Sequence, residues 1–188
     1  MAVANHSESK KFVNSGFSNF FELFNLPQKF EVNLTELDQI YLKIQQEVHP
    51  DKHTSSGEAQ KRVAMQLSTY ANTAFETLKD PIKRGFYLCE LSGLELQLET
   101  NTTMPPEFLI QQMEWREELD EIKQDVDRLE DLFQMISNEK NNLLVEVKNL
   151  IDVLRDLPKA LNQLRCALFM ERFLEDVSRH IDVSLSNS

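Results

Sequence analysis

The stretch from Tyr41 to Lys52, YLKIQQEVHPDK, decides the fold of the N-terminal half of the chain. Apolar residues here and just upstream recur at the spacing of one helix face: Leu34, Leu37, Ile40, Tyr41, Ile44 and Val48. Pro50 ends this helix because proline has no N–H to donate and disfavours a helical conformation for the residue before it. The pattern predicts a helix over 34–49, with Asp51 beyond the break.

A second helix is expected after the polar loop from His49 to Gly57, HPDKHTSSG. Its apolar residues also share one face: Ala59, Val63, Leu67, Tyr70, Ala74 and Leu78. Two amphipathic helices joined by a short loop can close as an antiparallel hairpin. We therefore expect helices over 58–79 and 81–92, the latter ended by Gly93, and the tripeptide His49-Pro50-Asp51 exposed at the hairpin tip.

The sequence on both sides of the hairpin carries a family resemblance. A short apolar helix over 18–25 precedes it, and the stretch ANTAFETLKDPIKRGFYL follows it. Seven residues of the second stretch fit the pattern N-x-A-[YF]-x-x-L-x-D-P-x-x-R: Asn72, Ala74, Phe75, Leu78, Asp80, Pro81 and Arg84. With HPDK at the tip, residues 17–93 resemble a J-domain, which implies an all-α domain whose tip binds an Hsp70-type ATPase.

Composition excludes several functional classes. The four glycines of the 188 residues stand too far apart for either common nucleotide-binding loop. Cys89 and Cys166 form no C-x-x-C pair, so we expect no disulfide, no metal site, no cofactor and a reducing compartment. We find no apolar run of membrane-spanning length and no signal-peptide pattern, which favours the cytoplasm. The net charge of −11, concentrated after residue 93, argues against nucleic acid and favours a protein partner.

The remainder of the chain divides into a disordered extension over 1–16, a linker over 94–104 and a C-terminal domain over 105–188. The domain begins with a heptad-like stripe: Phe108, Gln112, Trp115, Leu119, Ile122, Val126, Leu129, Phe133 and Ile136. Residues 107–154 form one helix or two, since Asp127 and Glu130 could make a capping box. Asp156 is the expected N-cap of a last helix to about 183. The result is a three-helix bundle or a coiled-coil hairpin.

Several large apolar residues fall off these stripes. Leu109, Ile110 and Met113 are expected to face away from the core, beside Glu117 and Glu121. Phe169 and Phe173 fall off the stripe of the last helix. Such residues either form a protein-binding surface or pack on a neighbouring helix or the J-domain, because a three-helix bundle can bury more than one face.

The stretch from Phe108 to Glu121, FLIQQMEWREELDE, resembles the scaffold-binding helix of HscB-type co-chaperones of iron-sulfur cluster assembly. The resemblance implies a non-enzymatic adaptor that stimulates the Hsp70 HscA and delivers the scaffold IscU. It implies these scaffold contacts: Leu109, Ile110, Met113, Glu114, Arg116, Glu117, Glu121 and Phe169. It implies these Hsp70 contacts: His49, Pro50, Asp51, Lys52, Lys43, Lys61 and Arg62.

The chain departs from the family pattern in two ways. Lys43 is the only cation on the helix before HPD, and no N-terminal cysteine-rich segment is present, as in the bacterial form. Two rival interpretations remain. His49, Asp51 and His53 could form an H-x-D-x-H metal site, but a helix break separates them and Lys52 stands among them. A general J-protein for unfolded clients usually carries Gly/Phe-rich or zinc-ribbon segments, which this sequence lacks.

Overall fold

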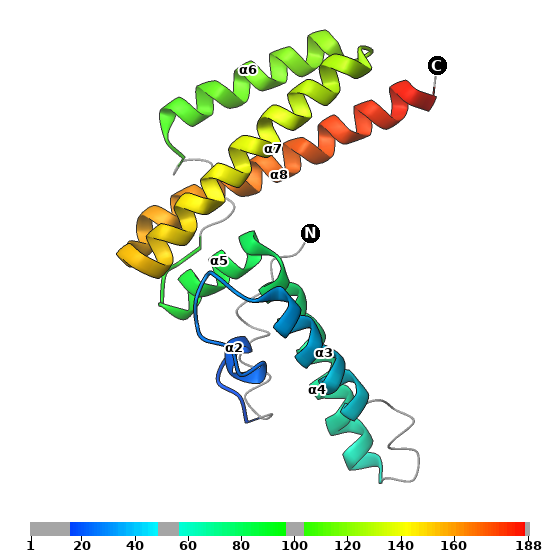
Figure 1. Cartoon of the computed structure of the whole chain (residues 1–188), viewed down its shortest axis with the longest axis vertical. Coiled ribbons are helices and arrows are strands. Elements are labelled where there is room, and N and C mark those ends of the chain that lie inside the picture. The colour runs from blue at the N-terminus through cyan, green and yellow to red at the C-terminus, as the bar shows by residue number, and fades with distance from the viewer. Residues whose placement is uncertain (1–15, 49–56, 97–103, 187–188) are drawn as a thin grey trace. The chain divides into compact units, whose positions relative to one another are not determined.

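The structure, a computed structural model, describes residues 16–48, 57–96 and 104–186 (Figure 1). Every regular element in these ranges is helical, as the periodicities predicted. The chain folds as two compact units, Met1–Leu88 and Cys89–Ser188. Residues 1–15 of the extension predicted over 1–16 and most of the predicted linker lie outside the described residues. No helix in the described ranges combines the length and the apolarity needed to cross a bilayer.

The first unit is built on a helical hairpin. It contains α2 (Phe20–Leu23), α3 (Leu34–Val48), α4 (Glu58–Lys79) and the larger part of α5 (Pro81–Leu91). In Figure 1, α3 and α4 lie side by side, and α2 packs against α4. The largest fully buried side chains of the unit come from all four helices and the segment after α2: Phe21, Phe24, Leu37, Leu78 and Phe86. The predicted helix boundaries agree with these elements to within two residues where the structure describes them.

The apolar face predicted for the hairpin is not buried along its whole length. Leu34, Ala59 and Val63 are exposed, and Val63 keeps 60% of its surface accessible. Tyr41 stacks on Phe75, with 4.0 Å between the ring centroids, and the Ser68 hydroxyl donates to the Gln45 side chain over 3.4 Å. In this register, the part of α4 before Ala64 projects beyond Val48, the last described residue of α3. The first turns of α4 therefore have no described helix packed against them. Leu34 is exposed as the first residue of α3.

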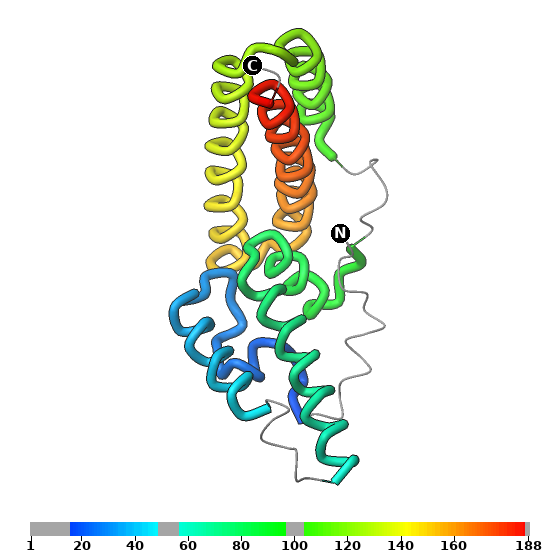
Figure 2. Tube along the Cα trace, turned by 90° about the vertical axis from the view of Figure 1, so that its right-hand side faces the viewer, coloured from blue at the N-terminus to red at the C-terminus, as the bar shows by residue number. Residues whose placement is uncertain are grey.

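The second unit contains α6 (Pro106–Ile122), α7 (Val126–Asn149), the π-helical segment η4 (Leu150–Leu154) and α8 (Leu157–Ser186). Figure 2 shows α7 and α8 running side by side. Contacts of Phe108 with Phe169, Trp115 with Phe173 and Lys123 with Ser184 advance together, so α6 runs parallel to α8. Trp115, Ile122, Leu129, Ile136, Met170 and Val177 form much of the core. The three-helix bundle is therefore the correct alternative, because all three helices share one core.

Two helix caps settle the boundaries left open by the sequence. Residues 107–154 form two helices, and the N-cap of α7 is Asp125, whose carboxylate accepts from the Arg128 N–H over 3.2 Å. The capping box that Asp127 and Glu130 could have made is not the one that starts this helix, because Asp127 already lies in the first turn of α7. Asp156 precedes α8 as predicted and accepts from the Lys159 N–H over 3.1 Å.

Candidate functional site: a hairpin tip and an exposed helix face

The predicted Hsp70-binding residues lie on both flanks of the hairpin tip. His49, Pro50, Asp51 and Lys52 themselves, and with them the rival metal-site prediction, fall outside the described residues. Lys43 is exposed on α3, and Lys61 and Arg62 are exposed in the first turns of α4. Lys61 pairs with Glu58 over 3.5 Å, an exposed contact that water screens strongly. The described part of the site thus consists of Lys43 on α3 and a solvated basic pair, Lys61 and Arg62, at the start of α4.

Asn72, a residue of the J-domain pattern, joins the two helices of the hairpin. Its side-chain oxygen accepts hydrogen bonds from the Tyr41 hydroxyl over 3.0 Å and from the Gln45 amide over 2.5 Å. Two donors from α3 converging on one acceptor of α4 fix the register between the helices. Asn72 therefore supplies an acceptor oxygen that holds the two helices of the hairpin together.

The residues Asp80, Pro81 and Arg84 organise the turn from α4 into α5. The Asp80 carboxylate accepts from the backbone N–H groups of Ile82 and Lys83 over 2.8 and 3.0 Å, which caps α5. Pro81 suits the first helical position because an N–H there has no helical partner. The buried Arg84 guanidinium donates to the carbonyls of Phe30 and Leu78. These pattern residues therefore hold the hairpin against the segment before α3 and serve a structural role.

The outer face of α6 is exposed, as the stripe predicted. Leu109, Ile110 and Met113 keep 37, 59 and 64% of their surfaces accessible. Glu114, Arg116, Glu117 and Glu121 are exposed around them. No neighbouring helix of the described C-terminal unit buries these three apolar side chains, so for them the alternative of packing on a neighbouring helix is wrong. We call these seven residues the α6 patch; their binding of a partner stays a prediction.

Phe169 differs from the α6 patch because it is half-buried and belongs to an aromatic cluster. Its ring lies 5.8 Å from that of Phe108, edge to face, and 6.2 Å from that of Phe173. The guanidinium of Arg116 lies 5.6 Å from the Phe169 centroid, at the distance of a cation–π contact. This contact brings Phe169 beside the α6 patch, although the two lie on different helices.

Phe173 falls off the predicted stripe of α8 but does not face outward; it packs on a neighbouring helix, the second of the two alternatives that the sequence left open. Its side chain is only 4% exposed and packs against Trp115, with 6.1 Å between ring centroids. The physical reason is that α8 packs against α6 as well as α7, so it buries two faces. Apolar residues on more than one stripe of α8, including Met170, Phe173, Leu174 and Val177, are the signal that indicates the second neighbour.

Neither cysteine offers reactive chemistry. Cys89 and Cys166 are buried free thiols, and burial raises the pKa of each to about 11. A neutral thiol is a poor nucleophile and a poor metal ligand at physiological pH. Within the described ranges, no three His, Cys, Asp or Glu side chains are grouped so that they could hold a metal ion.

A J-domain followed by a helical C-terminal domain defines a J-domain co-chaperone, and the comparisons with known proteins identify this class. A family model described as the HSCB C-terminal oligomerisation domain matches residues 104–178. A co-chaperone protein HscB homolog of Ralstonia nicotianae is 41% identical over 172 residues, covering 90% of this chain and 98% of the relative. Another from Burkholderia multivorans is 41% identical over 164 residues, covering 86 and 93%.

Solved structures agree with these relatives. HscB from Vibrio cholerae matches with a TM-score of 0.79 at 30% identity, covering 88% of this chain and 99% of that one. The human co-chaperone HscB matches with a TM-score of 0.81 at 26% identity, covering 85 and 80%. The chain belongs to the HscB family of co-chaperones.

Proposed function

We propose that this chain is an adaptor of iron-sulfur cluster assembly in the bacterial cytoplasm. It stimulates ATP hydrolysis by the Hsp70-type chaperone HscA and delivers the scaffold IscU to it. The observation that supports this most is the α6 patch, an exposed apolar surface flanked by carboxylates on a helix of the C-terminal unit. A surface of this kind is typical of protein-binding sites.

The hairpin supplies the Hsp70 contact in this proposal. Asp51 makes a charge-assisted contact with a basic group of the ATPase, and His49 and Pro50 orient the loop. Lys52, Lys61 and Arg62 provide most of the positive charge, since Lys43 is the only cation on α3. The hydrogen bonds of Asn72 keep the two helices that carry the loop in register.

The α6 patch and Phe169 supply the scaffold contact. Leu109, Ile110 and Met113 act as apolar anchors, each expected to contribute more than about 1 kcal/mol to binding. The surrounding carboxylates, Glu114, Glu117 and Glu121, select a basic partner surface and exclude acidic ones. Two sites on one chain make capture of the scaffold by the chaperone nearly intramolecular, because tethering raises the effective concentration.

Two sets of variants test the proposal with purified HscA and IscU. His49→Gln and Asp51→Asn should each abolish ATPase stimulation while leaving IscU affinity unchanged, because the tip and the α6 patch are separate surfaces. Leu109→Ala combined with Met113→Ala should lower IscU affinity more than about tenfold and leave scaffold-free stimulation intact. ATPase assays and calorimetric titration provide the two measurements. Stimulation that persists in both tip variants contradicts the Hsp70 assignment.

Val145→Ala combined with Val153→Ala is the matched control. Both valines belong to the C-terminal unit and keep 68 and 70% of their surfaces accessible, yet they lie outside the α6 patch. This control pair should change neither ATPase stimulation nor IscU affinity. If the Leu109/Met113 pair also leaves IscU binding unchanged but weakens binding of an unfolded polypeptide, the chain is instead a general J-domain co-chaperone for unfolded clients.

A further inference from the structure

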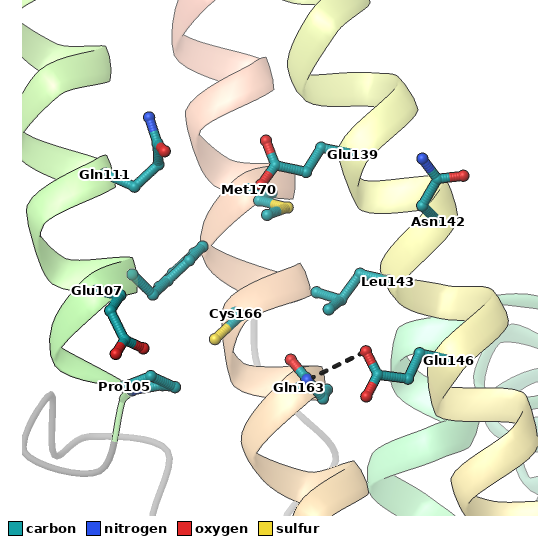
Figure 3. Close-up of a pocket in the computed structure, with 11 residues that line it drawn as sticks. Pro105, Glu107, Gln111, Glu139, Asn142, Leu143, Glu146, Gln163, Cys166 and Met170 are labelled. Carbon is teal, nitrogen blue, oxygen red and sulfur yellow. Dashed lines mark hydrogen bonds between the residues drawn. The ribbon is translucent and has the colours of Figure 1, made fainter.

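A groove separates the first half of α6 from the second half of α7. It has a volume of about 440 Å³ and is floored by α8. Figure 3 shows α6 with Glu107 and Gln111 on one side, α7 with Glu139, Asn142 and Leu143 on the other, and Met170 and Cys166 between them. The volume falls in the range of ligand-binding clefts in proteins, which is about 300 to 1,000 Å³.

The floor of the groove is apolar. Phe108 and Leu143 are half-buried and pack against the core of the unit, while Met170 is almost fully buried. Cys166 contributes a neutral thiol, since burial raises its pKa to about 11. Phe108 and Leu143 therefore leave apolar surface in contact with water that a bound apolar side chain could cover.

The two walls carry negative charge. Glu107 on α6 and Glu139 on α7 are exposed, and neither makes an ion pair with any described residue. Glu146 is already engaged by Lys159 over 3.2 Å and by Gln163 over 3.3 Å. The described lining includes no lysine or arginine. Two carboxylates on opposite walls, free of a described cation, complement a positively charged ligand.

The groove adjoins the α6 patch but does not coincide with it, since Gln111 on the groove wall donates a hydrogen bond to Glu114 of the patch over 3.1 Å. At about 100° per residue, with Phe108 at zero, Glu107 falls near 260° and Gln111 near 300°, on the side of α6 that faces α7. Leu109, Ile110 and Met113 span roughly 100 to 200°, so they point away from this side, with Ile110 the nearest to it. None of these three apolar anchors lines the groove, so a ligand could occupy the groove without covering them.

We propose that this groove binds a short, basic and partly apolar peptide segment of a protein partner. An apolar side chain of the segment lies over Phe108, Leu143 and Met170, and flanking lysine or arginine residues lie beside Glu107 and Glu139. The small volume admits side chains of an extended segment but not a folded domain. This inference stands whether or not the α6 patch binds the scaffold.

Peptide binding tests the inference on the full chain. The probe is a fluorescein-labelled octapeptide of sequence GSKLKFGS, and the comparison peptide is its charge-reversed form GSELEFGS. GSKLKFGS should bind saturably, and its affinity should fall as the salt concentration rises, because exposed charges are screened. GSELEFGS should not bind. Glu107→Gln combined with Glu139→Gln should lower the affinity for GSKLKFGS at least about fivefold, as expected when charge-assisted contacts are removed.

Glu118→Gln combined with Glu130→Gln is the matched control. It removes the same charge from the same two helices at exposed carboxylates that make no ion pair with described residues and do not line the groove. It should change the affinity less than about twofold, a margin that covers the weak, screened effect of distant surface charge. In nuclear magnetic resonance spectra, the backbone signals of Gln111, Asn142 and Leu143 should shift on titration, whereas those of Glu121 in the α6 patch and Arg128 at the start of α7 should not.

Three outcomes overturn the inference. The first is the absence of saturable binding of GSKLKFGS, and the second is an equal loss in both charge variants, which indicates attraction to net charge alone. The third is self-association of the wild-type chain that the Glu107/Glu139 pair abolishes in sedimentation velocity experiments. In that case the occupant is a second copy of this chain.

Discussion

Arg84 shows how one buried cation can hold a small domain together. Its guanidinium donates to the backbone carbonyls of Phe30 and Leu78 and lies 5.1 Å from the centre of the Phe30 ring. Phe30 lies between α2 and α3, whereas Leu78 is near the end of α4. One side chain thus satisfies buried backbone groups from two distant segments of the sequence.

Replacing Arg84 with alanine should lower the free energy of unfolding by about 2 to 4 kcal/mol, because two buried carbonyls lose their donor. Lysine should restore only part of the loss, since an ammonium group cannot donate in two fixed directions from one plane. Urea unfolding followed by circular dichroism measures both variants. Equal stability of the alanine and wild-type chains would mean that water replaces the guanidinium without cost.

The two thiols predict a distinct pH dependence. Burial raises the pKa of Cys89 and Cys166 from 9.0 to about 11, so the native state keeps them protonated where the unfolded chain does not. Their contribution to stability is therefore complete below pH 9 and is lost as pH rises toward 11. At pH 8, labelling by a thiol reagent should be at least about a hundredfold slower in the native protein than in urea. Comparable labelling rates in the two states would contradict burial of the thiols.

At the scale of the helix, the turn between α6 and α7 depends on one cap. Asp125→Ala should destabilise the protein by about 1 kcal/mol, because the first turn of α7 loses the acceptor of the Arg128 N–H. Asp127→Ala is the matched control and should cost only a few tenths of a kcal/mol, through the helix dipole alone. Thermal unfolding separates the two. A larger loss of stability in Asp127→Ala than in Asp125→Ala would instead indicate a capping box formed by Asp127 and Glu130.

The two faces of α6 should respond differently to truncation. Leu119→Ala should cost about 2 to 5 kcal/mol, because Leu119 is 7% exposed and belongs to the core. Leu109→Ala and Met113→Ala should each stay within about 0.5 kcal/mol of wild type, since both are exposed. The stability loss of Phe169→Ala should lie between these two values, because the Phe169 ring packs on Phe108 and Phe173. Calorimetric melting of the four variants checks this order.

The helices themselves could be predicted from sequence because apolar periodicity and helix-ending prolines are local signals. The exposure of Leu109, Ile110 and Met113 followed from the same arithmetic, since residues off a single stripe face away from it, whereas Glu114 and Arg116 were added to the site by the family resemblance alone. Phe173 could not be placed this way, because its burial depends on which second helix α8 meets. The cap at Asp125 was missed because Asp127 and Glu130 offered an equally plausible pattern two residues later. Choosing between these two N-caps requires knowing where α6 ends and how the chain turns into α7.

At the scale of the whole molecule, the proposed function requires the hairpin tip and the α6 patch on the same chain. An equimolar mixture of the Asp51→Asn variant and the Leu109→Ala/Met113→Ala variant contains one intact copy of each site. The mixture should not restore scaffold-dependent ATP hydrolysis, because delivery relies on a tether that sets the effective concentration. Steady-state ATPase assays at about 1 μM protein, near the affinities expected for such contacts, measure it. Recovery of more than half the wild-type rate would mean that the two sites act as separate modules or within an oligomer.

The aromatic cluster of the C-terminal unit also provides an intrinsic fluorescence probe. Trp115 is the single tryptophan of the chain, and it lies 1% exposed between Phe108 and Phe173. Phe169 touches both of these phenylalanines, and Arg116 lies over its ring. A ligand that settles on Arg116 and Phe169 therefore disturbs the surroundings of one indole. Its ultraviolet emission can follow occupancy of the α6 patch in real time, without any attached dye.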